Sequence, residues 1–314
     1  MKPLRWLVVG VLSVVVGCSK PAAQKTADSK GQEENKKPVA SQTMKPDEAL
    51  RAMTVTLVVE NRPELIWQAL PPSYQKDVKD IVSQFAGKMD AEVWNKAFAV
   101  ARKAVDVLKK QKTNIIELIK QNPLVPLDEA QMTNVSEHWD EVVGLLEILV
   151  NSEFAKLESL KEADIEKFLS GTIKNFMNKA TAIAKKVDDA EASKSIEKLK
   201  NAKIEVVKAT DTEATVKVDS GEESHEIQMV KVDGKWLPKD MVDAWEGQIR
   251  SAKQRLEGID TETVQKFKPI ILSALDAVEK GLDKLATAKT PAELVQRAQE
   301  LASEIMQAAG QPQQ

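Results

Sequence analysis

Thiols, imidazoles and aromatic rings are scarce in this sequence. Among 314 residues there are one cysteine, one tyrosine and two histidines, and aromatic residues make up 4% of the chain. Because Cys18 is the only thiol, intrachain disulfides are excluded, and the residues after it cannot build zinc–thiolate or iron–sulfur sites or supply a cysteine nucleophile. His138 and His225 are too few and too far apart in the sequence for a multi-histidine site. We therefore expect no metal and no cofactor.

An excess of positive charge is also missing. The chain has 45 Lys+Arg against 48 Asp+Glu, a formal net charge of −3 and a pI near 5.7. Most of the basic residues are lysines, which lack the planar guanidinium that favours phosphate contacts. These values argue against nucleic acid as a partner. With 42% hydrophobic and 30% charged residues, the composition is that of a globular chain with a core.

The short motifs of the common enzyme classes are absent. The sequence has no Gly-x-Ser-x-Gly, Walker loop, His-Glu-x-x-His, EF-hand loop or dinucleotide-binding glycine pattern. Two Ser-x-x-Lys matches, at Ser73 and Ser195, are expected by chance in a lysine-rich chain and lack their companion motifs. His138 and Glu141 would lie one helical turn apart, which we interpret as a surface pair. The sequence therefore predicts a protein that is not an enzyme.

The N-terminus has the layout of an export signal. Lys2 and Arg5 precede an apolar run, residues 6–16, which is too short to cross a bilayer core of about 30 Å as a helix. The run ends in Val15-Val16-Gly17-Cys18, which resembles the lipobox of bacterial lipoproteins. The resemblance implies that Val15, Val16 and Gly17 are recognised by the signal peptidase, that cleavage follows Gly17, and that Cys18 is acylated.

An acylated Cys18 would make membrane lipid a partner of the mature chain. Two or three acyl chains, as the lipoprotein family carries, would hold the protein firmly on a membrane without spanning it. Ser19 after the cysteine favours the outer membrane, by analogy with enterobacterial sorting. The expected location is therefore the cell envelope, on the outer membrane and facing the periplasm.

Composition and periodicity divide the chain into five segments. Residues 1–17 form the signal peptide, and residues 18–45 are a polar, lipid-anchored tether with a typical span of roughly 30 Å. Residues 46–200 show helical spacing, residues 201–240 alternate with the period of strands, and residues 241–314 return to helical spacing. The fold class predicted is α+β and mainly helical, with an antiparallel meander of three or four strands packed on the helices.

Several local patterns carry this prediction. Asp90 suits the N-cap of a helix, and Asp233-Gly234 suits a two-residue hairpin loop. A further apolar face, which we expect to pack on the common core, comprises Val135, Trp139, Val142, Leu146 and Leu149.

The C-terminal segment predicts a helical hairpin. Apolar residues recur with four-three spacing from Ile271 to Leu285 and again from Leu294 to Ile305, and Thr290-Pro291 would start the second arm. The apolar side of this hairpin, formed by these regularly spaced residues, has two interpretations. The hairpin packs on its own chain, or it offers its helices to a protein partner.

Residues 212–241, which contain the acidic-Gly-Lys-Trp turn Asp233-Gly234-Lys235-Trp236, resemble the closing hairpin of lipoproteins with an NTF2-like (cystatin-like) domain. The helices on both sides of the strands are longer than in that family. The resemblance implies a curved sheet that could enclose an apolar ligand, and Trp236 and Trp245 are the candidates to line its open mouth.

The leading hypothesis is a lipid-anchored cell-envelope lipoprotein without enzymatic activity, which acts by protein–protein contacts as a scaffold or assembly subunit. The alternative is a small-ligand-binding cystatin-like module with an apolar pocket. A lipid-anchored hydrolase that relies on carboxylates, which need no short motif, is a lesser alternative.

Overall fold

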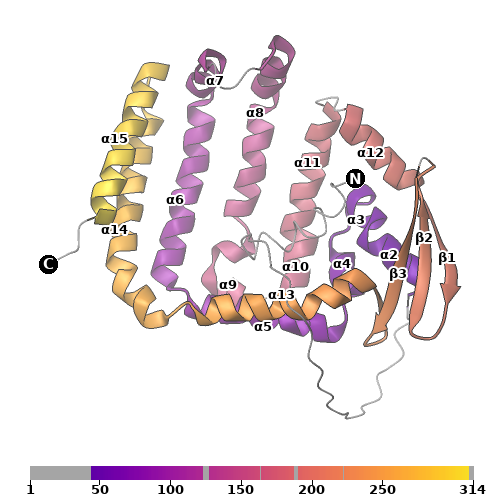
Figure 1. The fold of residues 1–314 in the computed structure, drawn as a ribbon. Coiled ribbons are helices and arrows are strands. Elements are labelled where there is room, and N and C mark those ends of the chain that lie inside the picture. Colours follow the sequence, from indigo (N-terminus) through magenta and orange to yellow (C-terminus); the bar gives the residue numbers. More distant parts are fainter. Residues whose placement is uncertain (1–43, 123–126, 163, 187–189, 222, 311–314) are drawn as a thin grey trace.

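The computed structural model describes residues 44–122, 127–162, 164–186, 190–221 and 223–310. Within these ranges the chain is mainly helical and contains one four-stranded antiparallel sheet (Figure 1). The α+β, mainly helical fold class predicted from the sequence is confirmed.

The helices of the first two thirds of the chain are α2 (Pro46–Met53), α3 (Val55–Val59), α4 (Glu64–Ala69), α5 (Pro72–Lys88), α6 (Ala91–Lys110), α7 (Lys112–Gln121), α8 (Glu129–Val150), the 3₁₀ helix η1 (Glu153–Ala155), α9 (Leu157–Glu162), α10 (Ile165–Phe168), the π-helical turn η2 (Leu169–Ile173), α11 (Lys174–Lys186) and α12 (Ala190–Asn201). They are followed by the strands β1 (Lys203–Ala209), β2 (Glu213–Asp219), β3 (Ser224–Val232) and β4 (Lys235–Pro238), and by the helices α13 (Lys239–Glu257), α14 (Thr261–Ala286) and α15 (Pro291–Gly310).

The long helices form a row that stands on a base. Helices α5 and α13 lie along the base, and α6, α8 and α11 stand beside one another across it (Figure 1). Contacts run from α14 to α6, from α6 to α8 and from α8 to α11. The sheet lies at one end of the row and the α14–α15 pair at the other, so the row is the central feature of the fold.

The sheet is a simple meander with the strand order β1-β2-β3-β4. Val216 of β2 pairs with Ile227 of β3, and Val230 of β3 pairs with Leu237 of β4. Asp233 and Gly234 connect the last two strands with φ angles of 47° and 79°. Both angles are positive, as a tight two-residue hairpin loop requires, and the Asp-Gly prediction is confirmed.

The first core lies between the sheet and α2. Val216 and Met229 are 0% and 1% exposed, and they pack with Leu50 of α2, which is 2% exposed. Alternation along each strand places these side chains on one face of the sheet, and the apolar side of α2 covers that face. The core therefore joins the helical N-terminal part to strands more than 150 positions later in the sequence.

The second core lies beneath α13. The rings of Tyr74 and Trp245 stack with their centroids 4.0 Å apart and their planes 4° apart. The indole Nε1 of Trp245 donates a hydrogen bond to Oδ2 of Asp77 at 3.1 Å. Because α5 carries both Tyr74 and Asp77, the two base helices are joined by an apolar and a polar contact together.

The C-terminal helical hairpin packs on its own chain. Leu282 and Leu285 of α14 share a core with Val100 and Val107 of α6. Asp90 caps α6 as predicted, because its Oδ1 accepts hydrogen bonds from the backbone N–H groups of residues 92 and 93. Of the two interpretations of the apolar side of the hairpin, the contact with the chain's own body is therefore present.

Candidate functional site: an apolar helix stripe and a polar pocket

The residues predicted for lipidation and signal-peptide cleavage lie outside the described part of the chain. These residues are Val15, Val16, Gly17 and Cys18. No helix among the residues that the structure describes has both the length and the apolar character needed to cross a membrane.

The two tryptophans proposed to line a ligand pocket are buried. Trp236 is 6% exposed and belongs to the core beneath the sheet, where Lys231 Nζ lies 5.0 Å from the centre of its ring. Trp245 is 5% exposed and stacks on Tyr74. Neither residue lines the two pockets described below. Their indole faces contact the core instead of an open mouth, and their role in ligand binding stays a prediction.

Both histidines sit beside a carboxylate. His138 Nδ1 lies 3.1 Å from Glu141 Oε2, and His225 Nε2 lies 3.2 Å from Glu223 Oε2. Hydrogen bonds from Lys186 and from His138 lower the pKa of Glu141. Among the described residues no three His, Cys, Asp or Glu side chains come together as metal ligands would. Each pair is a local contact, within α8 for His138 and at the start of β3 for His225.

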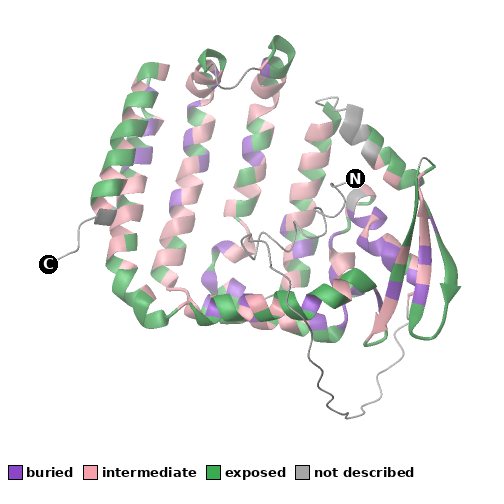
Figure 2. Cartoon of the chain, viewed as in Figure 1, coloured by how far each residue is buried: buried purple, intermediate pink, exposed green. Residues whose placement is uncertain are grey.

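Part of the predicted apolar face of α8 is open to solvent, which corrects the prediction that the whole face packs on a common core, whereas Val135 and Trp139 are partly buried. Val142, Leu146 and Leu149 are 48%, 42% and 36% exposed. Spaced by four and three residues, they form one line along the helix, here called the α8 stripe. By contrast, their neighbour Val143 is 3% exposed. Figure 2 shows both buried and exposed residues along α8.

Among the described elements, α8 packs against α6 on one flank and α11 on the other, and it also contacts α7. Toward α6, the indole Nε1 of Trp139 donates a hydrogen bond to the carbonyl oxygen of Leu108 at 3.0 Å. Toward α11, Glu141 forms an ion pair with Lys186. On a helical wheel the stripe falls between these two flanks. A single row of helices therefore leaves this apolar side uncovered by any described residue that would bury it.

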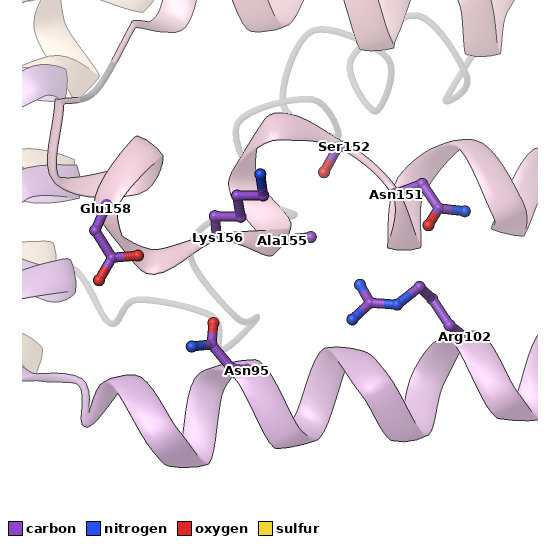
Figure 3. A pocket seen from close by; sticks show the side chains of 7 residues that line it. All are labelled: Asn95, Arg102, Asn151, Ser152, Ala155, Lys156 and Glu158. Carbon is purple, nitrogen blue, oxygen red and sulfur yellow. The ribbon is translucent and has the colours of Figure 1, made fainter.

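A second feature is a polar pocket of about 470 Å³ between α6 and the segment that follows α8 (Figure 3). Asn95 and Arg102 line it from α6, and Lys156 and Glu158 line it from the other side. The guanidinium NH1 of Arg102 donates a hydrogen bond to the carbonyl oxygen of Val150, at the end of α8, at 3.2 Å. This bond holds Arg102 at the pocket wall.

Another depression, of about 380 Å³, lies on α13 alone and is lined by Glu246, Ile249, Arg250, Lys253, Gln254 and Glu257. All of its lining residues come from one helix. A surface of this kind has no opposing wall, and we assign no site to it.

Sequence reasoning found neither feature as a site. Periodicity identified Val142, Leu146 and Leu149 as one apolar side, but periodicity does not say whether another element covers that side. Arg102 and Lys156 belong to elements that meet only in the folded chain, so no local motif joins them. Comparison with known proteins adds no assignment: no family model, no curated protein and no solved structure matches the chain.

Proposed function

We propose that the protein is a lipid-anchored cell-envelope lipoprotein without enzymatic activity, which acts by protein–protein contacts as a scaffold or assembly subunit. The observation that carries the contact function is the open α8 stripe. Three large aliphatic side chains in line, each more than one third exposed, are costly to leave in water and are typical of surfaces that other proteins cover.

The shape of the site supports a helical partner. The stripe runs along one line of a long helix between two flanking helices, α6 and α11. A partner helix with apolar residues at the same spacing would bury the stripe as an additional neighbour of α8. The partner helix would then form a second layer of helices over the α8 stripe, where the single row of helices has none among the described residues.

The N-terminal sequence supports the anchor and the location. The lipobox-like residues before Cys18 and the polar segment 18–45 would hold the folded body close to a membrane surface while leaving its helices free to meet partners. The proposed role thus combines a fixed location with an exposed apolar contact surface.

In-cell photo-crosslinking tests the proposed contact. A photo-crosslinking residue at position 146 should give a defined adduct with a protein partner, and the charged variant Val142→Asp should remove that adduct. The matched control carries the same photo-crosslinking residue at position 207 in β1, because Val207, like Leu146, is an exposed aliphatic residue, at 56%, but lies outside the helix row. Equal adducts at both positions, or none at position 146, would refute the contact.

A further inference from the structure

The polar pocket joins two parts of the chain that are distant in the sequence. Asn95 and Arg102 reach it from α6, while Asn151, Ser152, Lys156 and Glu158 come from the end of α8 and from the η1–α9 segment. Its volume of about 470 Å³ lies within the range of small-molecule sites. Figure 3 shows Arg102 and Glu158 toward opposite ends of this space.

Arg102 differs from the lysines of the same helix. Lys96, Lys103 and Lys109 of α6 each form an ion pair with a carboxylate of α14 or α8. Arg102 instead donates to one neutral carbonyl oxygen and has no ion pair with any described carboxylate. A guanidinium has five N–H donors in a planar fork, so most of its donor capacity remains available at the pocket wall.

Other polar groups of the pocket also lack partners within the described chain. The side chains of Asn95, Ser152 and Lys156 form no hydrogen bond or ion pair with another described residue. Arg102 and Lys156 therefore line the pocket together with the carboxylate of Glu158, and the exposed Lys156 side chain points away from Arg102 in Figure 3. The excess of positive over negative side chains in the lining favours an anion at the end where Arg102 lies.

We propose that this pocket binds a small ligand through a carboxylate or phosphate group, which the Arg102 guanidinium holds and toward which the exposed Lys156 side chain turns on binding, with Asn95 and Ser152 as further hydrogen-bond donors. Glu158, toward the other end, suits a hydroxyl or ammonium group on the same ligand. Because the bond to Val150 already positions the guanidinium, binding would require little further ordering of Arg102. This site is separate from the α8 stripe, and neither proposal depends on the other.

Inorganic phosphate is the first probe. The full-length, ¹⁵N-labelled chain is titrated with phosphate at constant ionic strength, with chloride as the reference anion, and amide shifts are followed by NMR. We expect saturable shifts at Asn95, Arg102 and Ser152. Acetate is then titrated in the same way, and its competition with phosphate decides whether the site takes both oxyanions or phosphate alone.

Substitutions at Arg102 and Lys156, with one control, locate the binding group. Arg102→Met and Lys156→Met should each raise the Kd for phosphate about tenfold, as the loss of one charge-assisted hydrogen bond does. The control Lys110→Met removes an exposed cation of α6 outside the pocket and should leave the Kd unchanged. Since Arg102 also contacts the end of α8, Arg102→Lys and Lys156→Met keep the test valid if Arg102→Met does not fold. The proposal is overturned if neither anion gives saturable shifts or if Lys110→Met weakens binding as much as Lys156→Met.

Discussion

Lys268 of α14 and Asp90, the N-cap of α6, form an ion pair in which Nζ lies 3.0 Å from Oδ2. The pair joins the start of one upright helix to its neighbour in the row. Burial raises the pKa of Asp90, but hydrogen bonds from Lys268, from the Val93 backbone N–H and from Gln265 outweigh it, and the pKa falls from 3.8 to about 2. The ionised form is therefore favoured in the folded state.

The lowered pKa of Asp90 predicts a pH dependence of stability. The contribution of the ionised Asp90 carboxylate to the free energy of unfolding is fully present above the unfolded-state pKa of 3.8 and is lost as the pH falls toward about 2. In Asp90→Asn, which keeps a good helix cap, the free energy of unfolding should depend less on pH across this window. Urea denaturation at several pH values measures the difference. Asp128→Asn is the control, because Asp128 caps α8 without a lysine ion pair in the described chain. An unchanged pH profile in Asp90→Asn would contradict the role of the ion pair.

Gly281 is a close-approach position between α14 and α15. A Cβ atom built there would lie 2.3 Å from Leu301 Cδ1, so Gly281→Ala should destabilise the chain by about 1–3 kcal/mol through overpacking. Gly144→Ala is the matched control within a helix, since a Cβ there meets nothing within 4 Å, and it should stabilise by up to about 1 kcal/mol. Chemical denaturation gives both values. If Leu301→Ala does not relieve the effect of Gly281→Ala, the clash is not its cause.

Two adjacent valines of α8 test whether the α8 stripe is open. Val143 is 3% exposed and Val142 is 48% exposed. Val143→Ala should cost about 2 kcal/mol of unfolding free energy because it removes two buried methyl groups, whereas Val142→Ala should change it by less than about 0.5 kcal/mol. Urea denaturation of the purified protein compares the two. Similar losses would mean that the stripe is covered.

The lipid anchor is tested at its single attachment point. Cys18→Ser should abolish incorporation of labelled fatty acid and leave unprocessed precursor, because the chain has no second thiol to accept lipid. Metabolic labelling followed by immunoprecipitation checks both effects. Ser19→Ala, at the next position, should still be labelled. Labelling of the Cys18→Ser variant would exclude a thioether anchor at this position.

Local signals predicted the parts of the fold that depend on local chemistry. Asp90 caps its helix and Asp233-Gly234 turns its hairpin because each effect involves backbone groups within a few residues. The apolar side of α8 was also predicted, but not its exposure, because covering an apolar side needs an element from elsewhere in the chain. The same reason applies to Trp236 and Trp245, whose burial depends on α2 and α5. The pocket combines residues of α6 with residues that follow α8, a combination that only the tertiary fold brings together.

The contact between α13 and α5 has a consequence for the order of folding. The hydrogen bond from Trp245 to Asp77 spans 168 positions of sequence, and the stack with Tyr74 spans a similar distance. Contacts of such long range form late, because a large loop must close first. A chain that leaves the ribosome or a translocation channel N-terminus first cannot complete its base until α13 has emerged. Until then the ring of Tyr74 lacks the Trp245 ring on which it stacks. The helices synthesised before α13 keep part of their apolar surface exposed to solvent during this time.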